Sequence, residues 1–551
     1  MNSSVRITFL GGLGEIGRNC AAIEIDNRIV LLDCGQLFPY KHPGIDSILP
    51  DFKWLIDRHD DIEACILSHS HEDHMGGIPH LFRHVSVPIY GSPFTLGMVK
   101  AKLESHEVDV PPLVSIEDNE ILEIGPFECE FLPVTHSTPG GLMTMFKTPQ
   151  GVILHSSDFK LDPTPVDKRL TDLNRVSDVS RKEGIRLLLA DSTNSESDGV
   201  SLSESEIGPI LEEVFIENEG RRIIVGTFSS HIHRIQQIAD AAMKTGRKLA
   251  VLGPSMIRNV ALARELGLLH LSDRVLLTEK ELKSFRSDKV CIICTGSQAE
   301  SRAAISMMSA GKHSLIEIDK NDTVIFSSAP IPGNEASIFR VHNKLARLGA
   351  RIVHSGKLNI HTTGHGKAGE LLALHEASNP EFFIPVHGEY THLLGHEEIA
   401  LNRGMTQSNV LRCVDGDRVL LDEHGVHLEG RVSDEYLMVD TRGVEVSNGL
   451  VKERISLGGE GFILLRVVVD EKGKRLLERP FAATFGWVEA EDKEEWLNEI
   501  IEEVIKVMDI ALVENKVDQK ELTRLVRRTA GKYVDLKTGR RPVLVPIVEI
   551  N

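Results

Sequence analysis

Residues 69–74 read His-Ser-His-Glu-Asp-His and directly follow the apolar run Ala-Cys-Ile-Leu-Ser. Three imidazoles and an Asp in so short a stretch are costly to explain as packing, whereas both groups are ligands for a divalent ion such as Zn²⁺. In a loop after a strand, His69 and His71 can face one way while Asp73 and His74 face another. One short loop could thus serve two ions about 3.5–4 Å apart, which predicts a two-metal site at a strand end.

A two-metal site needs further ligands, and these are expected where other strands end. The predicted strands end in polar residues of the ligand type: Asp33, His69, His136, Asp158, Asp191 and His387. Each of them alone could be an ordinary polar residue, but their order after the His-rich loop favours a shared site. The pattern places these side chains at one edge of a sheet.

The apolar pattern divides the chain into segments. Strand-like runs alternate with turns and short helices up to about residue 205, and residues 206–372 alternate strand with helix, which is typical of a parallel sheet. The helices predicted in this second segment cover residues 233–246, 256–267, 299–311 and 334–349. Residues 443–461 resemble a linker, and the tail after them predicts a strand, an acidic helix, a second helix and a final strand.

Residues 12–17, Gly-Leu-Gly-Glu-Ile-Gly, match the glycine pattern of a dinucleotide-binding loop. Such a loop must open a helix whose N-terminus faces the pyrophosphate. Residues 19–26 instead have the pattern of another strand. A Gly-rich turn between two strands is therefore favoured over a nucleotide site.

The chain has 551 residues, enough for several domains, and 41% hydrophobic with 26% charged residues excludes a disordered or fibrous protein. The net charge of −19 argues, taken alone, against a polyanionic partner. Much of this acidity is local, since residues 489–521 hold 12 acids and 4 bases whereas residues 522–551 hold 7 bases and 2 acids. A polyanion at a local site is therefore not excluded.

The seven scattered cysteines, an odd number, do not form a disulfide framework. Cys291 and Cys294 lie in an apolar strand-like run without a second Cys pair, which favours packing over a metal or redox role. The N-terminus lacks the apolar core of a signal peptide, and no apolar run reaches the roughly 18 residues of a membrane span. We therefore expect a cytoplasmic protein without membrane association.

Several motifs resemble those of a known fold. Leu-Asp-Cys-Gly around Asp33, the loop at 69–74, Pro-Val-Thr-His-Ser, His-Ser-Ser-Asp-Phe-Lys and Ala-Asp-Ser-Thr-Asn are similar to the successive motifs of the metallo-β-lactamase fold. The strand–helix segment, with His-Thr-Thr-Gly-His-Gly and Pro-Val-His-Gly-Glu-Tyr after it, resembles the nucleic-acid-processing β-CASP branch. Over the whole chain, the resemblance is to the bacterial ribonuclease J family of the actinobacterial type. Ser70 and Tyr390 depart from that family, where Gly is usual and Trp is frequent.

The resemblance implies an α/β fold: a metallo-β-lactamase αββα sandwich with an inserted β-CASP α/β domain and a small α/β C-terminal domain. The implied boundaries are 1–205 and 373–442 for the metallo-β-lactamase domain, 206–372 for the β-CASP domain, 443–461 for the linker and 462–551 for the C-terminal domain. The β-CASP domain is expected to lie across a cleft and to form a channel for single-stranded RNA.

The resemblance also implies the metal ligands. His69, His71 and His136 would hold one ion, Asp73, His74 and His387 the other, and Asp158 would bridge both. The expected ions are two Zn²⁺ per subunit, with Mn²⁺ as an alternative. Asp33 would orient the His-rich loop. Asp46 and Asp440 could hold a structural Ca²⁺, although solvated loop carboxylates are the simpler explanation.

Catalytic and substrate-binding residues follow from the same resemblance. His365 would lie near the scissile phosphate as proton donor or transition-state stabiliser, with Asp191 and Asp73 as the other catalytic residues. Hydroxyls and backbone N–H groups at helix starts suit phosphate, although ordinary N-capping is an alternative. The candidates to hold the RNA backbone and a 5′-monophosphate are Ser229, Ser230, His231, His361, Thr362, Thr363, Gly364 and His365, with the polar loop 295–298 as a further anion site.

The family implies an RNA-degrading hydrolase with 5′→3′ exonuclease activity that prefers 5′-monophosphate RNA, and with endonuclease activity, acting in rRNA maturation and mRNA decay. The chain would form a homodimer or homotetramer and would bind components of an RNA-degradation complex. The acidic helix carries Trp496, Ile500, Val504 and Val507 at helical spacing, which indicates either such an interface or packing within its own domain. The alternatives are a small-molecule thioesterase or lactamase, and a catalytically silent RNA-binding scaffold.

Overall fold

The computed structural model describes residues 3–39, 42–331, 333–470, 475–514 and 518–551. The chain forms two compact units. The first comprises the residues up to Phe38 together with Ser47–Leu437, and the second comprises Pro39–Asp46 with Met438–Asn551. No helix among the described residues is long and apolar enough to cross a membrane.

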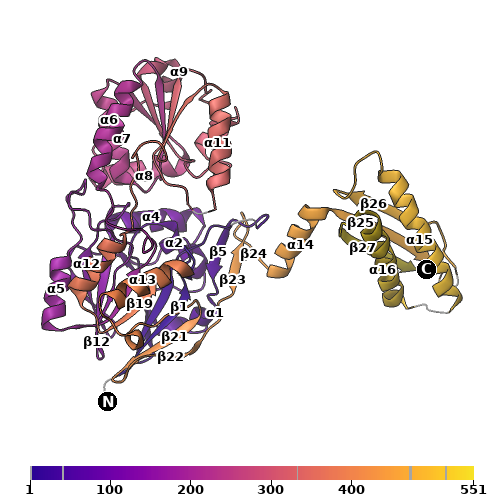
Figure 1. The fold of residues 1–551 in the computed structure, drawn as a ribbon, viewed down its shortest axis with the longest axis horizontal. Helices are drawn as coiled ribbons and strands as arrows, with labels where there is room; N and C mark the ends of the chain where they lie inside the picture. The colour runs from indigo at the N-terminus through magenta and orange to yellow at the C-terminus, as the bar shows by residue number, and fades with distance from the viewer. Residues whose placement is uncertain (1–2, 40–41, 332, 471–474, 515–517) are drawn as a thin grey trace. The chain divides into compact units, whose positions relative to one another are not determined.

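The first unit contains the metallo-β-lactamase sandwich, whose two sheets pack face to face (Figure 1). The larger sheet has the order β22 (Gly425–Arg431), β21 (Asp417–Asp422), β1 (Val5–Gly11), β3 (Cys20–Ile25), β4 (Arg28–Leu32), β6 (Ile62–Ile66), β7 (Ile89–Gly91) and β8 (Leu113–Ser115). The other has the order β19 (Phe382–Val386), β13 (Ile185–Asp191), β12 (Gly151–His155), β11 (Leu142–Thr148), β10 (Phe127–Pro133) and β9 (Ile121–Ile124). Phe9, Ile23, Phe131 and Phe146 from both sheets fill the core between them.

Local sequence explains these elements. Strands β13 and β19 pair in parallel and are almost continuously apolar. The reason is that both faces of their sheet are covered, one by the other sheet and one by helices. The turn from β3 to β4 uses Asp26 and Asn27, both with positive φ (50° and 65°), which is the backbone that a two-residue hairpin turn requires.

The β-CASP domain is inserted where the chain leaves β13 and returns at the neighbouring strand β19. Its sheet is entirely parallel, as predicted, in the order β15 (Lys248–Leu252), β16 (Val290–Cys294), β14 (Arg222–Gly226), β17 (Asp322–Phe326) and β18 (Arg351–His354). Its helices include α6 (Ile207–Glu217), α7 (Ile232–Lys244), α8 (Pro254–Glu265), α9 (Glu279–Ser284) and α11 (Glu335–Arg347). Figure 1 shows this domain as a lobe beside the sandwich.

One predicted helix is shorter than expected. The pattern predicted residues 299–311, but α10 covers only Ala304–Ser309. Gly296 (φ 108°) and Ala299 (φ 62°) adopt left-handed backbone conformations that a helix cannot contain, and the Gln298 side chain is used to bind the backbone of Ala329 and Ile331. Local turn geometry therefore overrides the helical pattern.

Three helices cover the outer face of the smaller sandwich sheet: α5 (Leu173–Lys182), α12 (Ala368–Ser378) and α13 (Tyr390–Asn402). None of the three was among the helices predicted by residue range, and α12 and α13 flank β19. Another helix, α4 (Pro93–Ser105), packs on the larger sheet beside β7 and β8. The outcome is the expected αββα sandwich.

The second unit has a sheet in the order β26 (Phe481–Phe485), β25 (Phe462–Val469) and β27 (Val543–Ile550), with helices α15 (Lys493–Val513) and α16 (Gln519–Thr538). Strands β25 and β27 are parallel. On the acidic helix α15, Ile500 and Val504 are fully buried in the core of this unit, so packing explains their spacing. Residues 443–461 contain helix α14 (Asn448–Glu460), which the linker prediction did not include.

All seven cysteines are unpaired and buried, and Cys291 and Cys294 lie inside β16. Burial raises the pKa of the Cys291 thiol to about 12, so it stays protonated and unreactive at neutral pH. The buried position of Cys291 and Cys294 in β16 agrees with the prediction that they serve packing.

Candidate metal centre

Asp33, directly after β4, connects two loops of the centre. It has a positive φ of 61°, and its carboxylate accepts hydrogen bonds from the Ser68 N–H and the Ser68 hydroxyl, both at 2.8 Å. The same carboxylate lies 2.8 Å from Nδ1 of His74. Asp33 is 2% exposed, so this carboxylate holds the start of the His-rich loop and one of its imidazoles together.

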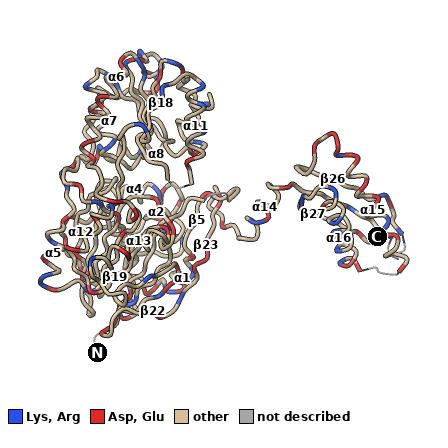
Figure 2. Tube along the Cα trace, in the orientation of Figure 1, with Lys and Arg blue, Asp and Glu red and all other residues tan. Residues whose placement is uncertain are grey.

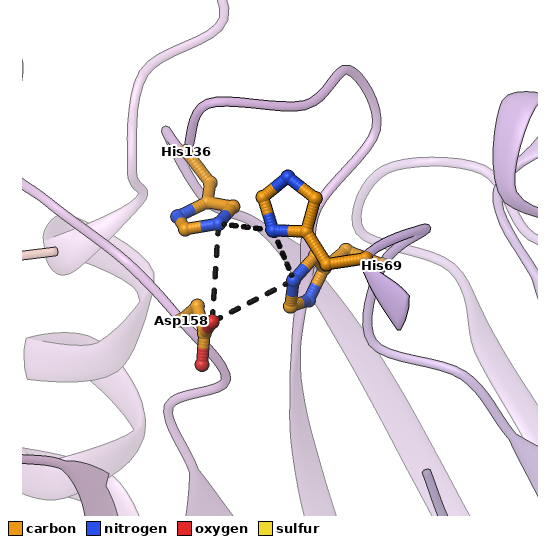
Figure 3. A group of neighbouring side chains, drawn as sticks. His69, His136 and Asp158 are labelled. Carbon is orange, nitrogen blue, oxygen red and sulfur yellow. Dashed lines mark hydrogen bonds and ion pairs between the residues drawn. The ribbon is translucent and has the colours of Figure 1, made fainter. Parts of the chain in front are cut away.

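The first group of candidate ligands consists of His69, His71, His136 and Asp158. Nδ1 of His71 lies 3.1 Å from Nε2 of His69 and 3.0 Å from Nε2 of His136. Oδ2 of Asp158 lies 3.6 Å from Nε2 of His69 and 3.8 Å from Nε2 of His136. Figure 3 shows His69, His136 and Asp158 pointing toward one another from different segments of the chain. One donor atom from each lies within 4.8 Å of the others.

The second group consists of Asp73, His74, His387 and the same Asp158. Nε2 of His74 lies 3.2 Å from Oδ2 of Asp158 and 3.5 Å from Oδ2 of Asp73. His387, which follows β19, places Nδ1 2.6 Å from Oδ1 of Asp158 and Nε2 3.5 Å from Oδ2 of Asp73. Asp158 therefore lies between the two groups.

The outer ring nitrogens of three histidines are bound to oxygen. Nδ1 of His69 is 3.0 Å from the Ser68 hydroxyl, Nδ1 of His136 is 2.8 Å from the Gly364 carbonyl, and Nδ1 of His74 is bound to Asp33. Such contacts fix the tautomer and direct the other nitrogen inward, as in metal sites. Nε2 of His387 is buried and has no hydrogen-bond partner among the described residues. Nitrogen and carboxylate donors in this arrangement fit a divalent metal.

The protonation of the histidines suits this use. Burial lowers the pKa of His71 to about 4 and holds the pKa of His69 and of His136 well below the usual value. At neutral pH these rings are uncharged, as metal ligands must be. Burial alone would raise the pKa of Asp158, but the surrounding imidazoles, His387 first, hold it well below its usual range.

His365 and Asp191 lie beside the two groups. Nδ1 of His365 is 2.7 Å from Oδ2 of Asp191, and Nε2 of His365 is 3.9 Å from Oδ2 of Asp158. Burial opposes the charged ring, but the Asp191 and Asp158 carboxylates outweigh it and raise the pKa of His365 to about 9. His365 therefore carries a proton at neutral pH next to the candidate ligands.

The loop from His361 to His365 follows β18 and reaches this centre. Besides the contact of Gly364 with His136, the Thr363 hydroxyl accepts a hydrogen bond from Nδ2 of Asn194, and the Thr362 hydroxyl donates to the Leu202 carbonyl. The Thr362 hydroxyl thus uses its proton in a backbone contact, and a role of Thr362 in holding substrate stays a prediction.

The predicted residues before α7 approach the same loop. The rings of His231 and His361 are 6.5 Å apart, and both nitrogens of buried His231 lack a hydrogen-bond partner among the described residues, as does Nδ1 of His361. Ser229 and Ser230 are partly exposed, and Ser229 accepts hydrogen bonds from Asn259. In the separate loop 295–298, Gln298 is engaged with the backbone, as described above.

Asn19 is a residue of the centre that the sequence analysis did not single out. Its Nδ2 lies 3.1 Å from Nε2 of His74 and donates to the Asp73 carbonyl at 3.1 Å. The Gly-rich turn at 12–17 precedes it, lies between β1 and β3 as predicted, and pairs through β2 (Leu13–Gly14) with β20 (Gly388–Glu389), next to His387. The glycine pattern was the available signal, since it marks a backbone that approaches the site closely.

The candidate calcium ligands lie elsewhere. Asp440 accepts hydrogen bonds from the Arg442 and Val444 N–H groups, and Asp46 is exposed. The groups of candidate ligands among the described residues include neither. A calcium ion at these residues stays a prediction.

Comparison with known proteins places four family models on the chain. They are the metallo-beta-lactamase superfamily over residues 13–189, the beta-CASP domain of ribonuclease J over 220–345, the RNA specificity domain of Zn-dependent metallo-hydrolases over 353–408, and the ribonuclease J C-terminal domain over 449–550.

Whole-chain relatives agree with these models. A protein named ribonuclease J from Mycolicibacterium smegmatis is 38% identical over 547 residues, which is 99% of this chain and 97% of the relative. Ribonuclease J from Mycobacterium tuberculosis is 38% identical over 550 residues, again 99% and 97% of the two chains. A crystal structure of an Enterococcus faecalis protein of unknown function matches with a TM-score of 0.53 and 15% identity, over 76% of this chain and 100% of that one, which supports the fold alone.

Proposed function

Since the chain belongs to the ribonuclease J family and is on that ground a metal-dependent ribonuclease, we propose that it degrades RNA as a 5′→3′ exonuclease that prefers 5′-monophosphate ends and also as an endonuclease. The observation that carries the proposal is the pair of His/Asp groups that share Asp158, with the contact of His365 and Asp191 beside them. A thioesterase or lactamase would not need the β-CASP domain, and a silent scaffold would not need all seven candidate ligands.

We propose that the two groups hold two divalent ions, Zn²⁺ or alternatively Mn²⁺. His69, His71 and His136 would hold one ion, Asp73, His74 and His387 the other, and Asp158 would bind both. When bound, two such ions supply the Lewis acidity that activates water and offsets the negative charge of the phosphate. Asp33 contributes by keeping the His74 ring in place.

His365 is the proposed proton donor. Hydrolysis that leaves a 5′-phosphate releases a 3′-oxygen, which needs a proton as the P–O bond breaks. Nε2 of His365 points toward the space next to Asp158, while Nδ1 is held by Asp191. Asp191 would thus orient the ring and stabilise its charged form before the proton leaves.

RNA would be held by the loops around this centre. We propose that Ser229, Ser230 and His231 bind phosphate together with the loop 361–364, because both ring nitrogens of His231 and Nδ1 of His361 are buried and have no hydrogen-bond partner among the described residues. A 5′-monophosphate bound there would set the distance to the scissile bond. Family membership further leads us to propose roles in rRNA maturation and mRNA decay, self-association as a dimer or tetramer, and a place in the cytoplasm.

The test compares labelled single-stranded RNA with a 5′-monophosphate or a 5′-triphosphate, given to purified protein loaded with Zn²⁺ or Mn²⁺. We expect stepwise release of mononucleotides, faster from the monophosphate, and its loss in His71→Ala. Absence of cleavage of both RNAs by metal-loaded protein would overturn the proposal.

A further inference from the structure

The segment that leads into the His361–His365 loop has a charge opposite to that of the whole protein. Residues 322–367 contain six Lys or Arg and two acids, Asp322 and Glu335, so their net charge is 6 − 2 = +4 in a chain of −19. These residues form β17, α11, β18 and the loop that ends at the metal centre. Figure 2 marks the Lys and Arg residues of this region in blue.

Three of the cations share one stripe of α11. Arg340, Lys344 and Arg347 are spaced four and three residues apart, which places them on the same side of the helix. Among the described residues none of the three forms an ion pair with an acid, and Lys357, after β18, contacts only the Ile352 carbonyl. Lys344 and Arg347 lie in the last turn of α11, where the helix dipole favours cations. Since no acid of the described residues neutralises the stripe, these charges are available to a bound anion.

Aromatic rings lie on the same helix and at the end of β18, where the charge of Lys357 acts on His342 and His354. Phe339 is 58% exposed, and its ring centroid lies 6.0 Å from that of His342. His342 in turn lies 5.2 Å from His354, with only 32° between the ring planes. Phe326, at the end of β17, packs against His342, with the two ring centroids 4.2 Å apart. Phe339, His342 and His354 thus form a row of rings in the β-CASP domain, in which Phe339 is exposed and the two histidines are half-buried.

This row lies at the edge of the sheet from which the loop to the metal centre starts. The Ser327 hydroxyl, directly after β17, donates to the Ile360 carbonyl, and the Ser355 hydroxyl, directly after β18, donates to the Ser328 carbonyl. Ile360 is followed by His361, the first residue of that loop. The aromatic row and the loop therefore belong to the same carboxyl edge of a parallel sheet, where ligands of such sheets bind.

We propose that a surface consisting of Phe339, Arg340, His342, Lys344, His354 and Lys357, the α11–β18 patch, binds single-stranded RNA beyond the nucleotides held at the metal centre. Bases would stack on the rings, and the backbone phosphates would lie against the cations. The inference rests on the proposed function, because the strand bound here is the substrate. An acidic protein partner would pair with the cations but would not require an exposed aromatic ring such as Phe339. The surface therefore fits RNA better than an acidic protein.

The test uses two variants of the metal-loaded full chain, Arg340→Gln/Lys344→Gln and Phe339→Ala. Their matched controls are Lys280→Gln/Lys283→Gln and Phe285→Ala, on and next to α9 of the same domain. The controls remove the same number of charges and the same type of ring at another place, where Phe285 is 38% exposed. Each protein is given 5′-monophosphorylated RNA of about 4 and about 20 nucleotides, and binding of the longer RNA to metal-free protein is followed by fluorescence anisotropy.

Both patch variants should raise KM for the longer RNA and weaken its binding. For Phe339→Ala we expect at least about fivefold weaker binding, the loss of one stacking contact. The double variant should also reduce the slope of log Kd against log salt by about 1.4, for two lost phosphate contacts. The short RNA and both controls should behave like the unaltered protein.

Three results would overturn the inference while the unaltered protein still cleaves RNA: unchanged binding of the long RNA in both patch variants, equal losses in the controls, or binding of polyglutamate in place of RNA at the patch. If the unaltered, metal-loaded protein cleaves no RNA at all, the proposed function has failed, whereas the anisotropy measurement still decides on the patch.

Discussion

Asp158 is the residue on which both groups of candidate ligands depend, since its carboxylate lies between the imidazoles of each. The sequence predicted which side chains would gather, because the residue types and their places at strand ends carry that information. That these side chains bind metal stays a prediction. Asn19 and Ser68 could not be found in the same way, since an amide or hydroxyl gains its role only from the fold that brings it to His74 or Asp33.

The contact of Asp33 with His74 leads to a prediction about metal affinity. Asp33→Asn keeps an oxygen for the Ser68 N–H but offers an amide where the His74 ring needs an acceptor. We expect metal affinity to fall by about 10- to 100-fold, measured by competition with a chromogenic chelator. Asp60→Asn, at a side chain that is 93% exposed, is the control and should bind metal as tightly as the unaltered protein. Equal affinities for all three would contradict the role of Asp33.

The pair of His365 and Asp191 predicts a pH dependence. Carboxylates raise the pKa of His365 to about 9, so the proton is present below that pH and is lost as the pH rises through it. Bound cations would lower this value, which places the alkaline limb of kcat/KM at or below about pH 9. Asp191→Asn should move the limb to lower pH and reduce kcat by about 10²- to 10⁴-fold. A limb at the same pH in the variant would contradict the assignment.

At the scale of elements, apolar alternation predicted the parallel sheet of the β-CASP domain and most of its helices. It overestimated α10, where a left-handed turn and the hydrogen bonds of Gln298 end the regular pattern. It missed α12 and α13, because these helices bury polar residues such as His375 and His396 that weaken the amphipathic signal.

These two histidines predict acid sensitivity. Nε2 of His375 lies 3.2 Å from Nε2 of His396, and burial lowers the pKa of His375 to about 3 and holds that of His396 well below its usual value. The folded state keeps both neutral, whereas the unfolded chain binds protons below about pH 6.5. The free energy of unfolding is therefore not reduced by these histidines above about pH 6.5. As the pH falls from about 6.5 toward 3, each histidine lowers it by up to about 1.4 kcal/mol per pH unit.

Urea unfolding of metal-free protein at pH 7.5 and 5.5 tests this expectation. His375→Leu should lose less stability between the two pH values than the unaltered protein, because one site of proton uptake is gone. His424→Leu, at an exposed histidine, serves as the control and should leave the pH dependence unchanged. An identical loss in His375→Leu would show that the pair does not control acid stability.

At the scale of the molecule, the negative charge is distributed unevenly. Residues 489–521, which include helix α15, hold 12 acids and 4 bases, while the segment from β17 to the metal centre is positive. A total of −19 thus says little about what a local surface binds. The order of the domains could be predicted from sequence motifs. The place of residues 39–46 in the second unit could not, because no local pattern records that contact.

Packing of α15 predicts where the second unit is sensitive to mutation. Ile500 is fully buried against the strands of this unit, so Ile500→Ala should lower its unfolding free energy by about 2–5 kcal/mol. Val513→Ala, at a side chain that is 85% exposed, should change it by less than about 0.5 kcal/mol. Thermal unfolding followed by circular dichroism measures both, and a stable Ile500→Ala protein would contradict a packing role.

The central claim is that the groups sharing Asp158 hold two divalent ions, and native mass spectrometry of protein equilibrated with Zn²⁺ tests it most directly. The structure predicts two ions on each unaltered chain, one on His71→Ala, which keeps the second group intact, and at most one on Asp158→Ala. Unaltered protein without bound ions, or Asp158→Ala that still holds two, would contradict the two-metal centre.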